Sequence, residues 1–380
     1  MKNWRYTLRS LSDWKSGPCS SMLLNSLYFS LRNFIPLSVR RGIRRRLVLR
    51  KREQVGDVWP IMPGSERPAE GWPGWPAGRQ FALVLTHDVE SQIGLDRVKE
   101  VAELEMRLGF RSSFNLVPEG DYRVTKELRG WLTCNGFEVG VHDIHHDGKL
   151  FRSHKNFTKS APLINQYLKA WDAVGFRSAF MLRNLDWIHA LDIAYDLSTF
   201  DTDPFEPQPD GTNTIFPFWI EPPVLGSQLP TVNYQPATIN QPRSGYVELP
   251  YTLVQDSTLF LLLRERTNCI WREKLDWIAK QGGMVLLNTH PDYMRFDGNG
   301  SLYEFPASQY QDLLEYVKST YAGRYWHALP REVARFVFQH RKTLMLRQTI
   351  RTKIPPTSPS RPWTLARPFR PSSSRSITGW

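Results

Sequence analysis

Three short segments of the chain concentrate histidine and carboxylate side chains. Residues 86–90 read T-H-D-V-E, residues 142–147 read H-D-I-H-H-D, and residues 288–292 read N-T-H-P-D. Imidazole and carboxylate together suit Zn²⁺ or a similar first-row divalent ion. His142 and His146 are four residues apart, so both could face one ion if this stretch turns helical. A carboxylate from the first segment would complete a site that leaves positions open for water and substrate.

Each of the three segments follows a short apolar run that reads as a buried strand. Such strands alternate with segments of helical spacing, which favours an α/β fold of the (β/α) barrel type with its active site at the C-terminal strand ends. The expected strands are 81–86, 112–117, 137–141 and 284–289, and the expected helices are 95–108, 126–135, 156–174, 259–281 and 308–320. Residues 200–245, rich in proline and asparagine, are expected to form a long loop over that face.

Several residues mark where the expected helices begin and end. Gly109 follows the helix predicted over 95–108, and Gly175 follows the one predicted over 156–174, so each glycine is expected to end its helix. Ser308 is the expected N-cap of the last helix.

Positive charge is concentrated at the two ends of the chain. Residues 1–54 contain 13 Lys and Arg against two acids, and residues 341–380 contain nine Lys and Arg with no acid. Because the whole chain carries +12, residues 55–340 carry −8. A net acidic body lacks the positive field that nucleic acids require, so we expect no nucleic-acid partner.

These differences divide the chain into four parts. We expect a basic helical extension over 1–58, a Pro/Gly/Trp-rich linker over 59–78, a catalytic domain over 79–340 and a basic Pro/Ser-rich tail over 341–380 that is disordered from 354 onward. In the extension, Val39, Ile43 and Leu47 are four residues apart among arginines, a pattern suited to an anionic membrane surface or an acidic partner. The alternative is a solvated basic arm.

Cysteine usage and hydropathy indicate the compartment. Three scattered cysteines, Cys19, Cys134 and Cys269, are too few for a disulfide framework or a Cys-x-x-Cys metal site, and we expect each to be buried. The N-terminus shows no signal-peptide pattern, and no apolar run reaches the roughly 18 residues needed to span a bilayer. We therefore expect a cytoplasmic protein that can lie at the periphery of a membrane.

Over about residues 78–300 the chain resembles the polysaccharide deacetylase family (carbohydrate esterase family four), whose fold is a distorted (β/α) barrel. The family motif T-F-D-D-G corresponds to T-H-D-V-E here, with Val89 in place of the second aspartate. The motif H-[ST]-x-x-H corresponds to His142 and His146, and L-x-x-H corresponds to Leu287 and His290. A third motif carries an arginine, which residues 175–179 (G-F-R-S-A) supply without its usual proline.

The resemblance implies a role for each matched residue. Asp88 would be the catalytic base, Arg177 would orient it, and His290 would be the acid. Glu90, His142 and His146 would hold the metal, with zinc as the expected ion, although the residues alone leave open whether Asp88 or Glu90 is the carboxylate ligand.

Other positions follow less directly from the motifs. Leu287, Trp187, Trp219 and Tyr293 are candidates to contact a sugar, against the alternative of ordinary core packing. The family's fourth motif contains an aspartate, for which Asp196, Asp201 and Asp203 are candidates, and Asp292 could orient His290 or simply occupy a turn.

These features lead to an expected function. The chain would be a metal-dependent hydrolase that removes acetyl groups, as an N-deacetylase, from an acetylated sugar, polysaccharide or glycolipid precursor, as in exopolysaccharide biosynthesis. Two alternatives stay open: a hydrolase of a small non-sugar amide, and a non-catalytic glycan-binding or scaffold protein with a degenerate site.

Overall fold

The computed structural model describes residues 37–222, 245–298 and 301–351. The predicted disorder over 354–380, the first part of the basic extension, Cys19 and most of the expected loop over 200–245 lie wholly or partly outside these residues. Among the described helices, none is long and apolar enough to cross a membrane.

A parallel sheet forms the centre of the molecule. Its strands lie in the order β1-β2-β3-β4-β5-β7, with β8 on the other side of β1, and β11 beside the first residues of β1. Among the strands that the structure describes, β6 alone pairs antiparallel within this sheet, against β7. The strand bounds are Phe81–Val89 (β1), Ser113–Leu116 (β2), Glu138–His142 (β3), Gly175–Arg177 (β4), Tyr195–Asp196 (β5), Phe218–Ile220 (β6), Tyr246–Glu248 (β7), Met284–Thr289 (β8) and Tyr325–His327 (β11).

The sheet curls until its two ends meet. Beyond β7 the chain bridges to β8 through Leu253 and Leu287, and the backbone N–H of Thr252 donates to the Leu286 carbonyl at 2.9 Å. This closure makes a distorted (β/α) barrel, as the sequence predicts, and it gathers the C-terminal ends of the strands at one mouth.

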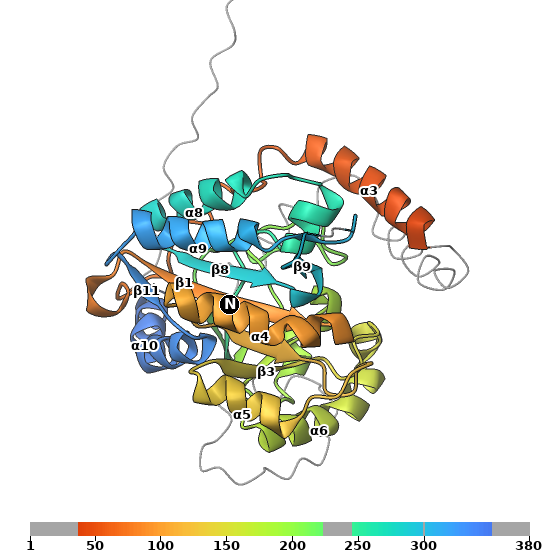
Figure 1. Ribbon diagram of the computed structural model, residues 1–380. Coiled ribbons are helices and arrows are strands. Elements are labelled where there is room, and N and C mark those ends of the chain that lie inside the picture. Colours follow the sequence, from red (N-terminus) through yellow and green to blue (C-terminus); the bar gives the residue numbers. More distant parts are fainter. Residues whose placement is uncertain (1–36, 223–244, 299–300, 352–380) are drawn as a thin grey trace, which may run out of the picture.

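Helices cover the outside of the barrel (Figure 1). They are α4 (Gln92–Leu108), α5 (Lys126–Cys134), α6 (His154–Trp171), α8 (Cys269–Gln281), α9 (Ser308–Thr320) and α10 (Pro330–Arg351). All residues of β1 and β8 are buried, because their inner side chains fill the barrel and their outer side chains meet these helices. Gly109 ends α4 with a φ of 87°, as predicted.

Three local predictions were wrong. Helix α6 ends at Trp171 with Asp172 in the left-handed region, and Gly175 instead begins β4, where a Cβ would collide with the Tyr195 ring. The helix predicted over 259–281 is divided into a π-helical segment η5 (Ser257–Leu262) and α8. The N-cap of α9 is Ala307, not Ser308.

The thiols also differ from the prediction. Cys134 and Cys269 are both free and exposed, because each occupies the solvent side of a surface helix end.

The segment that precedes β1 packs against the body. Helix α3 (Leu37–Gln54) contacts η5, and Val48 is buried. In residues 59–78, Trp59 and Trp75 are buried, and the Trp75 indole N–H donates to the Gly282 carbonyl at 2.8 Å. These tryptophans bury apolar area that an extended linker would leave in water.

Candidate metal centre and catalytic residues

The closed barrel brings the three polar segments together. Asp88 and Glu90 lie at the end of β1, His142 ends β3, and His290 follows β8. These strands run parallel, so their C-terminal ends share one edge of the barrel.

Glu90, His142 and His146 form a group that could hold a metal ion. One ligand atom from each lies within 4.8 Å of the others. The Nδ1 of His142 donates to the Arg177 carbonyl at 3.1 Å, so its lone pair is on Nε2, which is buried without a hydrogen-bond partner. The buried Nε2 of His146 lies 3.0 Å from Glu90 Oε1. Two imidazoles, one of them oriented by a backbone carbonyl, and one carboxylate are a donor set that fits Zn²⁺.

A non-helical turn, rather than the helical turn predicted, aims both imidazoles at one point. Asp143 and His146 have φ values of 55° and 51°, in the left-handed region. The Asp143 carboxylate accepts the N–H of Ile144 at 2.6 Å, which stabilises this turn from within. His145, between the two candidate ligands, is exposed and faces Glu119.

Two of the three groups, His142 and Glu90, are in the charge state that a bound cation requires. Burial lowers the pKa of His142 to about 4, so this imidazole is neutral near pH 7. Burial would raise the pKa of Glu90, but the neighbouring His146 charge and hydrogen bond outweigh it and hold that pKa below its usual range. Burial would lower the pKa of His146, but the Glu90 carboxylate raises it. The proton shared by His146 and Glu90 is the one that a bound cation would displace.

Asp88 stands beside this group and is held by three side chains. Asn115 donates to Oδ1 and Asn288 to Oδ2, each at 2.8 Å, and Arg177 Nε lies 3.4 Å from Oδ1. Arg177 is fully buried and also donates to Thr86 Oγ1 at 3.1 Å. Burial opposes ionisation of Asp88, but the Arg177 charge, nearby histidines and the Asn115 hydrogen bond lower its pKa.

His290 is oriented by an aspartate that sequence reasoning missed. Asp256 accepts from His290 Nδ1 at 2.6 Å and from its backbone N–H at 2.7 Å. Burial would lower the pKa of His290, but the Asp256 carboxylate raises it to about 10. The free Nε2 lies 3.7 Å from Glu90 Oε1, so the imidazole faces the ligand group.

Asp292, proposed from the sequence to orient His290, and the three candidates for the family's fourth motif make other contacts. Asp292 accepts from the Glu90 N–H at 3.0 Å and from Ser91 Oγ at 2.5 Å, just before α4 begins. Asp196 accepts from Ser198, Asp201 pairs with the buried Lys274 at 2.7 Å, and Asp203 accepts from Tyr251. Nothing in the residues around Asp256 marked it for this role in the sequence.

Of the four residues proposed to contact sugar, Tyr293 lies at the ligand group, whereas the other three pack elsewhere in the barrel or against its helices. Tyr293 donates to Glu90 Oε2 at 3.0 Å and so reaches the ligand group. Trp187 packs against an aromatic cluster that includes Phe151, and Trp219 packs against Phe338 of α10. Leu287 is buried inside β8.

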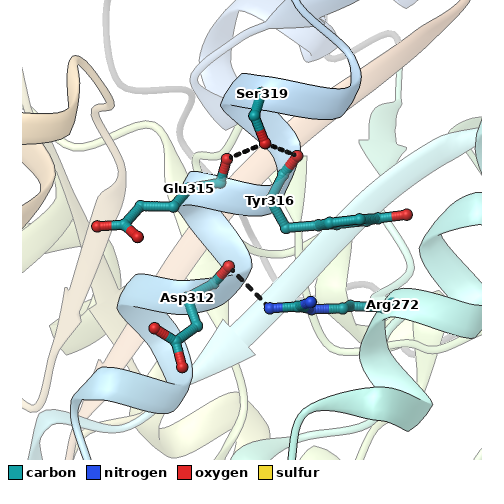
Figure 2. A pocket seen from close by; sticks show the side chains of 5 residues that line it. All are labelled: Arg272, Asp312, Glu315, Tyr316 and Ser319. Atoms are coloured by element: carbon teal, nitrogen blue, oxygen red, sulfur yellow. Dashed lines mark hydrogen bonds between the residues drawn. The ribbon is translucent and has the colours of Figure 1, made fainter.

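A surface hollow of about 410 Å³ lies away from the mouth, between α8 and α9 (Figure 2). Arg272 of α8 lines one side, and Asp312, Glu315, Tyr316 and Ser319 of α9 line the other. Arg272 donates to the Asp312 carbonyl at 3.3 Å and lies over the Tyr316 ring. The hollow belongs to the helical layer and shares no residue with the groups at the strand ends.

No protein-family model matches the chain, and no curated protein does. Solved structures that are similar include a protein from Mycobacterium smegmatis assigned as a polysaccharide deacetylase, with 15% identity, a TM-score of 0.49, and coverage of 76% of this chain and 97% of that one. The peptidoglycan deacetylase PdaC from Bacillus subtilis has 12% identity, a TM-score of 0.39, and coverage of 71% and 97%. The chitin deacetylase from Colletotrichum lindemuthianum has 11% identity, a TM-score of 0.37, and coverage of 67% and 87%.

Because the identities and TM-scores are this low, the chemistry of the site is inferred from the geometry of the chain's own residues. What these structures share with the chain is the fold.

Proposed function

We propose that this protein is a metal-dependent hydrolase that removes an acetyl group from an acetylated amino sugar. One observation carries the proposal. A group suited to a divalent ion, Glu90 with His142 and His146, lies close to an arginine-held carboxylate, Asp88, and to an aspartate-held imidazole, His290.

A divalent ion held by Glu90, His142 and His146 would polarise an acyl carbonyl and lower the pKa of a nearby water. Asp88 would accept the proton of that water. Asn115, Asn288 and Arg177 hold both of its oxygens and keep it ionised, so its free lone pairs stay available in one orientation.

His290 would donate a proton to the departing amine, which is a poor leaving group without it. Asp256 keeps Nδ1 protonated and directs Nε2 toward the ligand group, so the proton to be given is on Nε2. Acid and base assistance of this kind typically contributes about 10²–10⁴ in rate. An amine leaving group needs this proton more than the alcohol of an ester does, so a protonated imidazole at this position favours an amide substrate.

Tyr293 supports the same group from the far side by its hydrogen bond to Glu90 Oε2. Because Glu90 supplies the carboxylate, Val89 in the position of the family's second aspartate need not remove the metal. We propose zinc as the ion, and an acetylated sugar, polysaccharide or glycolipid as the substrate.

The test is a double substitution, His142→Ala with His146→Ala, in the full chain. We expect it to lose bound metal and hydrolysis of both an aryl acetate and N-acetylglucosamine oligomers while the circular dichroism spectrum stays unchanged. His145→Ala is the matched control, because this exposed neighbour points at Glu119 and should keep both properties. Retention of a full equivalent of metal by the double variant would refute the site, and metal binding without turnover in the native chain would support a glycan-binding protein instead.

A further inference from the structure

Exposed apolar side chains gather near the candidate site. Within the described residues the large ones are Leu47, Ile93, Phe296, Leu302 and Tyr303. We call Ile93, Phe296, Leu302 and Tyr303 the rim patch, because Ile93 lies in the first turn of α4, shortly after Glu90, and the others follow Tyr293 in the chain. Leu302 is 73% exposed and Ile93 is 56% exposed. Exposed apolar side chains that gather in one region mark a binding surface more often than single scattered ones do.

Polar contacts hold the two halves of the rim patch together. Arg97 of α4 donates to the Asp292 carbonyl at 3.1 Å and pairs with Glu304 at 2.5 Å. Ile93 is four residues before Arg97 and lies on the same face of α4, toward the segment that carries Leu302. These polar contacts therefore fix the backbone segments that carry the exposed apolar side chains.

Helix α3 adds a basic face with one apolar residue. Its 18 residues include eight Lys and Arg and one acid, Glu53. Arg46, Leu47 and Arg50 are exposed and lie within one turn of each other. Val48 is buried, so the helix turns its other side to the body.

The basic face and the rim patch lie on one side of the molecule. Helix α3 packs on η5, and Phe260 of η5 stacks on Phe305 at 4.4 Å, next in the chain to the rim-patch segment. Figure 1 shows α3 and β9 (Met294–Arg295) on the side toward which β8 points, which is the side of the mouth.

We propose that the rim patch and the exposed face of α3 form one surface that docks on an anionic lipid membrane, with the barrel mouth facing the headgroups. Arginines attract anionic headgroups, and apolar side chains beside them enter the interface. Nucleic acid or an acidic protein would satisfy the arginines but would leave Ile93 and Leu302 in water or require a matching apolar partner. Asp96 and Asp297 are exposed beside the rim patch, so the attraction has to come from α3.

A mouth held at headgroup level would reach sugars attached to lipids. The substrate class follows as an acetylated sugar on a lipid anchor, and this part of the inference rests on the proposed function.

The docking test uses the full chain and cosedimentation with vesicles of phosphatidylcholine alone or with phosphatidylglycerol. We expect binding only to the anionic vesicles, weakened by salt. Arg46→Glu with Arg50→Glu should weaken it at least about thirtyfold, since each arginine near such a surface contributes roughly a factor of five. Ile93→Gln with Leu302→Gln leaves the net charge unchanged and should weaken binding about tenfold by removing apolar insertion.

The control makes the same charge change at the other end of the barrel. Arg107→Glu with Lys280→Glu alters exposed residues in the last turns of α4 and α8, and should leave binding within about twofold. No binding to anionic vesicles, equal weakening by the control, or no effect of Ile93→Gln with Leu302→Gln overturns the docking surface.

Two substrates separate this inference from the proposed function. All these variants should hydrolyse a soluble aryl acetate at the native rate, whereas hydrolysis of N-acetylglucosamine on a lipid anchor should fall in step with vesicle binding. Vesicle binding without hydrolysis of either substrate would overturn the proposed function and leave docking standing. Hydrolysis of the anchored substrate that ignores the docking variants would overturn the lipid-anchored substrate class.

Discussion

Asp88→Asn tests the proposed base most directly. Arg177 is fully buried, and its Nε lies 3.4 Å from Asp88 Oδ1. Removing the carboxylate charge leaves this guanidinium buried and uncompensated, which typically costs about 3–5 kcal/mol. An asparagine amide also turns its NH₂ group toward one of the two donors, Asn115 or Asn288, and replaces a hydrogen bond by a donor–donor contact. We therefore expect the free energy of unfolding to fall by about 3–5 kcal/mol.

The same variant should lose turnover and keep its metal. If Asp88 is the base, kcat should fall about 10²–10⁴-fold, because base assistance is typically worth that much. The measurements are urea unfolding, metal content by mass spectrometry, and kcat on a soluble substrate below the unfolding range.

A matched control separates stability from chemistry. Asp201 and Lys274 form another buried ion pair, at 2.7 Å, on residues outside the ligand group. Asp201→Asn should destabilise the protein by a similar amount and leave kcat unchanged. Native turnover in Asp88→Asn refutes the base assignment. Loss of metal in that variant, with metal kept in Glu90→Gln, shows that the two carboxylates have each other's roles.

Three further outcomes are expected. Glu90→Gln should lose most of its metal affinity in a competitive chelator titration, because an anionic ligand becomes a neutral one. Asp256→Asn should lower kcat by about 10²-fold or more with metal retained, because the His290 ring loses the contact that orients it. The pKa of His290, which Asp256 raises, should also fall, so pH–rate profiles should show the alkaline limb at lower pH. Burial, reinforced by the Asp196 charge, raises the pKa of Glu248. The stabilisation from this group is therefore fully present below its unfolded pKa of about 4.3. It is lost as the pH rises toward the folded pKa, at up to about 1.4 kcal/mol per pH unit. Glu248→Gln should flatten that part of the stability curve in urea unfolding above about pH 5.

Each of these three predictions would be contradicted by a specific result. Unchanged metal affinity in Glu90→Gln removes it from the ligand set. An unmoved alkaline limb in Asp256→Asn means that the contact does not control His290. The same pH slope in Glu248→Gln and the native protein would place the proton uptake elsewhere.

Much of the barrel could be predicted because its signals are local. The apolar runs that became β1 and β8 are buried on both faces, so they are recognisable without knowing their partners. The spacing of apolar residues and the following glycine placed the end of α4 to the residue, whereas the helix begins at Gln92, three residues before the predicted start. The break between η5 and α8 was missed, because helical spacing continues across a segment whose backbone does not.

The candidate site likewise contains residues that local sequence patterns identify and residues that they do not. The motif-bearing residues, Asp88, Glu90, His142, His146 and His290, could be picked out from type and spacing within short segments. Asn115, Asn288 and Asp256 could not, because they carry no local signal and their roles exist only through contacts. Asn288 reaches Asp88 across 200 residues of chain, and Asp256 reaches His290 across 34.

By itself, therefore, the sequence determined which side chains can bind a cation or carry a proton, and roughly which strands present them. The tertiary structure decided how they are oriented and charged. Closure of the barrel sets two amides and a guanidinium around Asp88 and a carboxylate against His290, and burial there makes each of these contacts shift a pKa. Such shifts depend on distance and on exclusion of water, and residues far apart in the chain acquire both only when the sheet closes.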